Sequence, residues 1–231
     1  MRFYKFFISI FLIFTMCFYI TTPVFSEETT YVWSPNNNSL NDSTNDNSSQ
    51  VKETNSEVDE SNSLSLESGS AILIEQTTGQ VLYSHNAHEQ LRPASVTKVM
   101  SILLIMEALD SNKISLTDSV PCSENAASMG GSQIWLDPRE TLTVDEMLKA
   151  ICVNSANDCV VAMSEFIAGS EEAFVQLMND KAKELGMNDT CFKNCHGLDE
   201  DGHVTSAYDI SLMSRELLVN HPTITNYTTI W

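Results

Sequence analysis

A serine and a lysine stand three residues apart where the most apolar run of this sequence begins. Ser95 and Lys98 lie in "RPASVTKVMSILLIM", and residues 95–109 predict a helix that is apolar nearly all round and therefore buried. Residues three apart on a helix are neighbours, so the Lys98 amine can reach the Ser95 hydroxyl. Burial lowers a lysine pKa, and a neutral amine can accept the serine proton. The pair therefore predicts a serine nucleophile activated by a lysine base.

A second candidate pair is Ser155 and Asn157 in "NSAND", which we interpret as a tight break between two helices. The two spacings are weak signals by themselves, because they also occur at Ser49/Lys52, Ser43/Asn45 and Ser123/Asn125. Context separates the candidates from these matches. Ser95 opens a buried helix, and Ser155 lies in a helix break that can hold a side chain in place.

The elements expected around these residues are one short hairpin followed mainly by helices. The strand-like runs "SAILIEQ" and "QVLYSH", joined by "TTG", predict a β-hairpin. Capping residues predict four further helices: one after a capping box of Thr143 and Glu146, one that ends at Gly169, one from Ser170 to Gly186, and one from a capping box of Ser206 and Asp209 to Pro222. An isolated hairpin is marginally stable. We therefore expect an α+β fold whose antiparallel sheet is incomplete because C-terminal strands are missing.

The composition indicates an exported, acidic protein. The formal net charge of −19 and the lack of a Lys/Arg cluster exclude nucleic acid as a partner. Residues 1–26 have a basic start, an apolar stretch and small residues at the end, which predict a signal peptide. Residues 27–66 are rich in Asn and Ser and predict a disordered spacer. Residues 67–231 form the folded domain, which we place outside the cytoplasm near the membrane or cell wall.

Five cysteines remain once the signal peptide is removed: Cys122, Cys152, Cys159, Cys191 and Cys195. An odd number leaves at least one thiol unpaired in an exported chain. We expect buried free thiols, and a disulfide between Cys191 and Cys195 stays open at this point. "CFKNCH" lacks a second ligand pair at the spacing of a zinc finger. We predict neither a metal nor a cofactor.

The stretch from about residue 68 to residue 231 resembles the low-molecular-mass penicillin-binding proteins, the serine D-alanyl-D-alanine carboxypeptidases. "PASVTKVM" resembles the first motif of that family, and "NSANDC" with the following "VAMSEFIAGSEEAFVQLMN" resembles the second. "HGLDEDGHVTSAYDIS" is also similar to a stretch typical of the family. The resemblance implies a β-lactamase/transpeptidase-like fold, with an antiparallel sheet and a helical subdomain.

The resemblance also implies a reaction and a substrate, the peptidoglycan stem peptide that ends in D-Ala-D-Ala. Ser95 would attack the carbonyl between the two D-alanines, with Lys98 as the proton acceptor. Ser155 would relay a proton to the leaving amine, and Asn157 would hydrogen-bond the substrate and Lys98. Water would then hydrolyse the acyl-enzyme, and β-lactams would acylate the same serine.

The third motif of that family, Lys-Thr-Gly, does not occur in the 231 residues. In the family it lies on a strand that lines the site and helps to bind the terminal carboxylate. We therefore expect a truncated product whose full-length form is the enzyme, and a chain of 231 residues that has little activity alone.

Three alternatives are weighed against the carboxypeptidase. A class A β-lactamase would need a deacylating Glu-x-x-x-Asn loop, and Glu184 and Asn188 have that spacing, but Gly186 indicates a helix end there. An inactive wall-bound relative would not need all four candidate side chains. A Ser-His-Asp hydrolase is the poorest interpretation, because we place His203 and His221 on the surface and assign His196 a structural role beside the site.

Overall fold

The computed structural model describes residues 66–230. The predicted signal peptide and nearly all of the predicted spacer lie outside the described residues. Within 66–230, no helix is both long enough and apolar enough to cross a bilayer.

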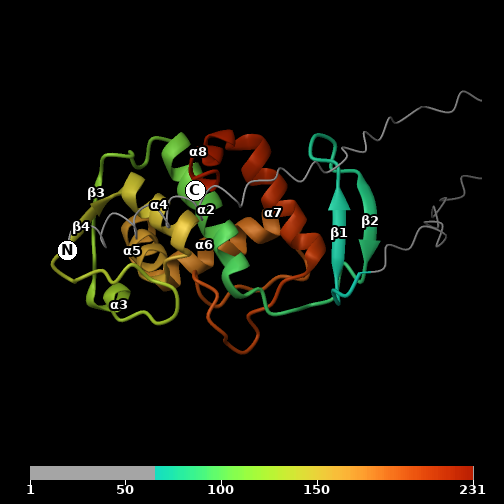
Figure 1. Cartoon of the computed structure of the whole chain (residues 1–231), viewed down its shortest axis with the longest axis horizontal. Helices are drawn as coiled ribbons and strands as arrows, with labels where there is room; N and C mark the ends of the chain where they lie inside the picture. Colours follow the sequence, from blue (N-terminus) through green and yellow to red (C-terminus); the bar gives the residue numbers. More distant parts are fainter. Residues whose placement is uncertain (1–65, 231) are drawn as a thin grey trace, which may run out of the picture. The chain divides into compact units, whose positions relative to one another are not determined.

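The folded part begins with the predicted hairpin. Strands β1 (Ala71–Ile74) and β2 (Val81–His85) pair antiparallel (Figure 1). The carboxylate of Glu75 accepts hydrogen bonds from the backbone N–H groups of Thr77 and Thr78, at 2.9 and 2.6 Å, and so holds the turn. The prediction of a hairpin in this segment is confirmed.

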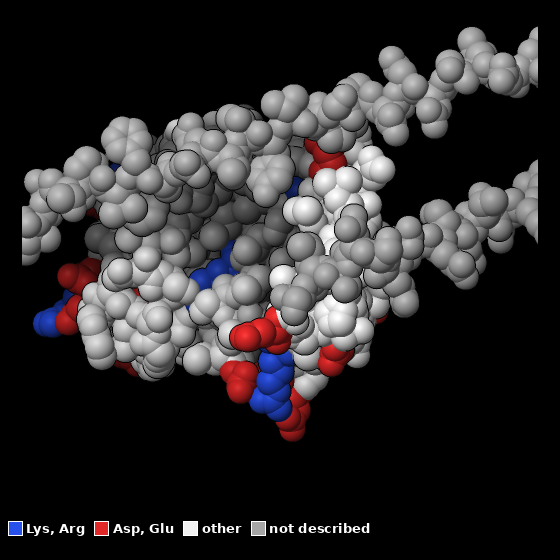
Figure 2. Space-filling model, turned by 45° about the vertical axis from the view of Figure 1, so that its right-hand side comes forward, with Lys and Arg blue, Asp and Glu red and all other residues white. Residues whose placement is uncertain are grey.

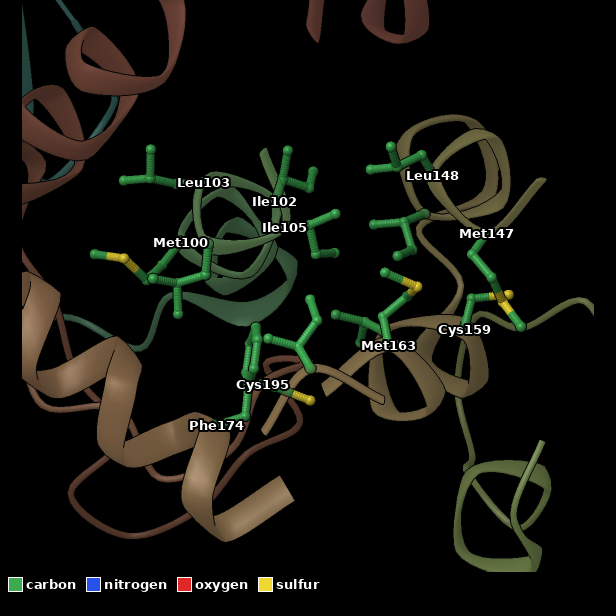
Figure 3. Close-up of a cluster of buried hydrophobic side chains, with 14 of the residues drawn as sticks. Met100, Ile102, Leu103, Ile105, Met147, Leu148, Cys159, Met163, Phe174 and Cys195 are labelled. Carbon is green, nitrogen blue, oxygen red and sulfur yellow. The ribbon is translucent and has the colours of Figure 1, made fainter. Parts of the chain in front are cut away.

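The apolar run forms the central helix of the domain. A 3₁₀ turn, η2 (Ala94–Thr97), leads directly into α2 (Lys98–Asp110). Helix α2 packs against α5 (Asn157–Ala168), α6 (Glu171–Glu184) and α7 (Ala207–Asn220) (Figure 1). Figure 3 shows its side chains meeting those of neighbouring segments; the buried set drawn there includes Met100, Ile102, Leu103, Ile105, Leu148, Met163 and Phe174. The predicted buried helix is confirmed, and only its first turn differs, being 3₁₀.

A second pair of strands precedes the helix that ends at the candidate Ser155. Strands β3 (Ser119–Pro121) and β4 (Thr141–Thr143) pair antiparallel, with the short α3 (Glu124–Ala127) between them in the chain. Helix α4 (Val144–Asn154) starts at β4, and the predicted capping box is present: Thr143 accepts from the Glu146 N–H while Glu146 accepts from the Thr143 N–H. This cap fixes where α4 begins.

Helix α6 starts and ends as its cap residues predict. The Ser170 hydroxyl accepts from the backbone N–H of Ala173. The helix ends at Glu184, and Gly186 follows with a left-handed φ of 75°. The segment that contains Glu184 and Asn188 is therefore a helix end, as expected, and not the deacylating loop of a β-lactamase.

Helix α7 is capped by Ser206, but the predicted capping box is only half present. Ser206 accepts from the Asp209 N–H at 3.2 Å. The Asp209 carboxylate instead accepts from the backbone N–H of Asp189 at 2.8 Å and from the Thr190 hydroxyl at 2.7 Å. A distant segment offers these donors, which local spacing cannot reveal. The short elements η3 (Pro222–Ile224) and α8 (Thr225–Thr228) follow α7.

Among the described residues the strands form two separate two-stranded antiparallel sheets, β1–β2 and β3–β4, and helices make up most of the rest. This is the predicted α+β organisation with little sheet. On the face shown in Figure 2, most of the described surface is uncharged, and acidic side chains gather beside a basic one at its lower edge.

Candidate active site

The Ser95 hydroxyl and the Lys98 amine lie together at the join between η2 and α2. The distance from Lys98 Nζ to Ser95 Oγ is 3.3 Å. A 3₁₀ turn has three residues per turn, so side chains at positions i and i+3 are aligned along its axis. The 3₁₀ geometry at this point therefore aligns the two side chains more directly than the α-helix expected from the sequence. Ser95 is exposed and Lys98 is 3% exposed, so the hydroxyl faces solvent and the amine does not.

Lys98 is held by one further partner, a backbone carbonyl from a distant segment. Its Nζ donates to the carbonyl oxygen of His196 at 2.7 Å. Burial lowers the pKa of Lys98 from its ordinary 10.5 to about 8, because an apolar environment disfavours the ammonium. A substantial fraction of the amine is then neutral near physiological pH, and a neutral amine can accept the Ser95 proton.

The segment that supplies this carbonyl binds α2 at two successive residues. The Ser101 hydroxyl donates to the carbonyl oxygen of Cys195 at 2.6 Å, one turn beyond the bond from Lys98 to His196. Next in the chain, Gly197 lies against η2 so closely that a Cβ there would be 1.9 Å from the Ala94 carbonyl oxygen. Only glycine fits this position, whose φ is 93°. This contact fixes the segment against the turn that carries Ser95.

His203 ties the same region to η2, and its predicted surface position is wrong. His203 is 2% exposed. Its Nδ1 accepts from the backbone N–H of Lys193 at 2.9 Å, so the neutral ring carries its proton on Nε2 and donates to Thr97 Oγ1 at 2.7 Å. His221 is also buried, at 8% exposed, beside Asp110. Both histidines find polar partners far away in sequence, which composition alone cannot show.

His196 has the site-adjacent position expected for it, and its ring has structural contacts. Nδ1 accepts from the backbone N–H of Leu198 at 3.1 Å, and Nε2 lies 3.4 Å from Glu171 Oε1. Its carbonyl, not its ring, contacts Lys98. Spacing along the sequence does not predict this contribution from a carbonyl, and its only signal is the stretch that begins "HGLD", which resembles the family.

Ser155 occupies the predicted break between α4 and α5. It is the residue that follows α4, with a left-handed φ of 55° and ψ of 39°. A non-glycine residue in this region is uncommon and turns the chain sharply. The hydroxyl of this half-buried serine is thereby placed between two helix ends, two residues before Asn157.

Asn157 is the first residue of α5. It is held by a loop that contains none of the predicted site residues. Its Nδ2 donates to the Gly130 carbonyl and its backbone N–H donates to the Ser132 carbonyl, both at 2.7 Å. The side chain is buried, and its Oδ1 has no hydrogen-bond partner. A buried acceptor without a donor is costly, and in residues 66–230 Oδ1 of Asn157 is the one buried side-chain oxygen or nitrogen that lacks a partner.

The surroundings of Lys98 and those of Asn157 are linked by two neighbouring segments. A Cβ at Gly131 would lie 2.8 Å from Asn157 Nδ2 and 3.5 Å from a methyl of Leu198. Leu198 is two residues beyond His196, whose carbonyl binds Lys98. The loop around Gly131 and the segment from His196 to Leu198 thus connect the surroundings of Lys98 to those of Asn157.

The five cysteines of the described part are all free, as expected. Cys122, Cys159 and Cys195 are buried, and Cys152 and Cys191 are partly buried. The disulfide left open between Cys191 and Cys195 is not formed. In residues 66–230, no cluster of three or more His, Cys, Asp or Glu side chains could hold a metal ion.

Residues 53–230 match the peptidase S11 family, described as D-alanyl-D-alanine carboxypeptidase. The chain belongs to this family. The carboxypeptidase DacF of Bacillus subtilis is 59% identical over 165 residues, which are 71% of this chain and 42% of that protein. DacC of Escherichia coli, also a D-alanyl-D-alanine carboxypeptidase, is 37% identical over 164 residues, or 68% of this chain and 41% of that protein. The chain thus spans about two fifths of the length of these relatives.

Solved structures of carboxypeptidases and penicillin-binding proteins share the fold. The carboxypeptidase DacD of Francisella tularensis superimposes with a TM-score of 0.70 at 32% identity, covering 71% of this chain and 40% of that one. Penicillin-binding protein D2 of Listeria monocytogenes, in its ampicillin-bound form, gives a TM-score of 0.65 at 28% identity, covering 73% and 68%. The predicted β-lactamase/transpeptidase-like fold of the penicillin-binding proteins is confirmed.

Proposed function

We propose that this chain carries the nucleophile of a serine D-alanyl-D-alanine carboxypeptidase that removes the terminal D-alanine from peptidoglycan stem peptides. The observation that carries the proposal is the pairing of an exposed serine hydroxyl with a buried lysine amine at 3.3 Å. Membership of the family supports the choice of substrate. A class A β-lactamase would share the Ser95 and Lys98 pair, but the segment from Glu184 to Asn188 is the end of α6 and not a deacylating loop. An inactive wall protein would not need a buried lysine beside an exposed serine.

The acylation step follows from the surroundings of Lys98. The neutral amine accepts the Ser95 proton as Oγ attacks the carbonyl carbon of the penultimate D-alanine, which becomes tetrahedral. The C–N bond then breaks, D-alanine leaves with a proton returned to its nitrogen, and an ester remains on Ser95. The hydrogen bond to the His196 carbonyl holds the amine in place during this exchange. A positioned base of this kind typically contributes about 10²- to 10⁴-fold in rate.

Ser155 and Asn157 act on the substrate side of the reaction. Ser155 relays the proton from Lys98 to the leaving amine. Asn157 has its Nδ2 engaged by Gly130 and its Oδ1 unpartnered, so Oδ1 accepts an N–H of the bound peptide. The backbone N–H of Ser95 donates to the developing oxyanion, where the loss of one donor typically costs about 3 kcal/mol.

The protein acts outside the cytoplasm, at the outer face of the membrane or in the wall, where its substrate lies. The predicted signal peptide at 1–26 and spacer at 27–66 support this location. β-Lactams are its inhibitors, because they acylate the same hydroxyl. A related protein, penicillin-binding protein D2 of Listeria monocytogenes, has a structure in ampicillin-bound form.

The test is covalent labelling by a fluorescent penicillin in a chimera. Residues 66–230 replace the matching segment of Bacillus subtilis DacF, which supplies the remainder of a carboxypeptidase. The chimera should be labelled and should release D-alanine from a stem-peptide analogue, and Ser95→Ala should abolish both. Ser123→Ala, which removes the cap of α3, is the matched control and should leave labelling intact. Labelling of the Ser95→Ala chimera would overturn the nucleophile assignment.

A further inference from the structure

Asp158, which follows Asn157 in the chain, is a fully buried carboxylate that accepts hydrogen bonds from backbone N–H groups. It is 0% exposed. None of the ion pairs within residues 66–230 involves it. Its oxygens accept from the N–H groups of Ile134 at 3.1 Å, Leu136 at 3.1 Å and Cys159 at 2.9 Å. A buried carboxylate without a cation depends on such donors, so these bonds hold strongly.

Two of these donors belong to the loop that also holds Asn157. The carbonyls of Gly130 and Ser132 accept from Asn157, and the N–H groups of Ile134 and Leu136 bind Asp158. Alternate residues of one loop thus bind the first two residues of α5. If the contacts to Asp158 were lost, the loop would be bound to the start of α5 only through Asn157, and the carbonyl that accepts from its Nδ2 would be held less firmly.

The residue between the two donors has an unfavourable backbone conformation. Trp135 lies between Ile134 and Leu136 with a left-handed φ of 66° and is 78% exposed. A bulky residue rarely adopts this conformation, and an exposed side chain gains no packing from it. Neighbouring N–H groups that converge on one anion form a nest, and a left-handed residue is characteristic of that arrangement. The bonds to Asp158 account for the conformation of Trp135.

We propose that Asp158 is a positioning residue: by binding the loop of residues 130–136 it fixes Asn157 so that the unpartnered Oδ1 meets the substrate amide. The proposal rests on the function proposed above, since it concerns the geometry of that same site. Asp158 touches neither the substrate nor Ser95. It acts through the loop and through Asn157.

The first experiment measures the loop directly and requires no activity. Asp158→Ala removes both carboxylate oxygens, and with them the acceptor that the N–H groups of Ile134 and Leu136 share. Amide hydrogen exchange of Ile134 and Leu136 in the 231-residue chain should become at least about 10-fold faster, since their acceptor is lost. The side-chain NH₂ resonance of Asn157 should shift towards that of a solvated amide. Unchanged exchange at both residues would overturn the proposal.

The matched control is Asp209→Ala. Asp209 is 1% exposed and likewise accepts from a backbone N–H and a hydroxyl, but its partners are Asp189 and Thr190 in another segment. It should destabilise the chain comparably and leave exchange at Ile134 and Leu136 unchanged. Equal acceleration in this control would show a general loss of stability and would contradict the positioning role.

The second experiment uses the labelled chimera. Asp158→Ala should lower the second-order rate constant of penicillin acylation at least about 10-fold, while labelling at saturation remains one per chain. Gly131→Ala displaces the same loop, because its Cβ would lie 2.8 Å from Asn157 Nδ2, and should also lower the rate constant; it supplies the test if Asp158→Ala fails to fold. Reduced stoichiometry with an unchanged rate constant would indicate a purely structural role. If the parent chimera fails to label, the proposed function fails, and the exchange experiment still decides the role of Asp158.

Discussion

The amine of Lys98 lies 2.7 Å from the carbonyl oxygen of His196, a residue 98 positions further along the chain. This bond orients the amine without placing a negative charge beside it, because a carbonyl carries no net charge. An Asp or Glu in the same place would raise the pKa of Lys98 and keep it protonated. A neutral acceptor therefore preserves the pKa of about 8 that burial produces.

The first prediction follows from that pKa. In the chimera, the rate constant of acylation should rise with pH and level off above about 8, because only the neutral amine accepts a proton. Lys98→Ala should lower the rate at least about 100-fold and remove this pH dependence. Lys183→Ala, which alters an exposed lysine of α6, is the control and should change neither. A pH-independent rate in the parent chimera would contradict Lys98 as the base.

The second prediction concerns the close contact of Gly197 with η2. Gly197→Ala places a methyl 1.9 Å from the Ala94 carbonyl oxygen and should lower the free energy of unfolding by more than about 3 kcal/mol. Gly169→Ala is a matched control, because Gly169 has a similar φ of 88° but open space around it. It should cost only about 1 kcal/mol, the price of the left-handed conformation. Urea unfolding measures both, and equal losses would show that η2 and Gly197 are not tightly packed.

The third prediction is a pH dependence of stability that arises from His203. Burial lowers the pKa of His203 below its ordinary 6.5, and Nδ1 is occupied by the Lys193 N–H. The unfolded state then binds more protons below about pH 6.5, so stability is fully present above that pH and falls as the pH decreases. The free energy of unfolding at pH 5.5 should drop relative to pH 7.5, and by less in His203→Gln. An identical drop in the variant would exclude His203 as a cause.

The fourth prediction tests the domain boundary. Limited proteolysis of the whole chain should cut first within residues 27–66, which we expect to be a spacer, and should leave a protected fragment that begins near Ser68. Mass spectrometry of the fragment gives its start. Early cleavage within α2 would contradict both the boundary and the buried position of that helix.

The sequence by itself determined the main helices and most of their ends, and it predicted which serine is the nucleophile. Apolar periodicity and cap residues act over a few positions, so the hairpin, the burial of α2 and the caps at Thr143 and Ser170 could be inferred locally. The pair Ser95 and Lys98 is also local, because residues three apart on a helical turn must meet. The choice of a 3₁₀ turn for that pair could not be inferred from spacing.

Only the tertiary structure decided what surrounds these residues. His196 meets Lys98 across 98 positions and His203 meets Thr97 across 106. Asp158 binds a loop 22 to 24 positions earlier in the chain. These contacts are hydrogen bonds between segments that are brought together when the core is buried. The order of residue types along the chain does not indicate which donors and acceptors will then be neighbours. For the same reason Asp209 binds Asp189 and Thr190 rather than completing its local capping box.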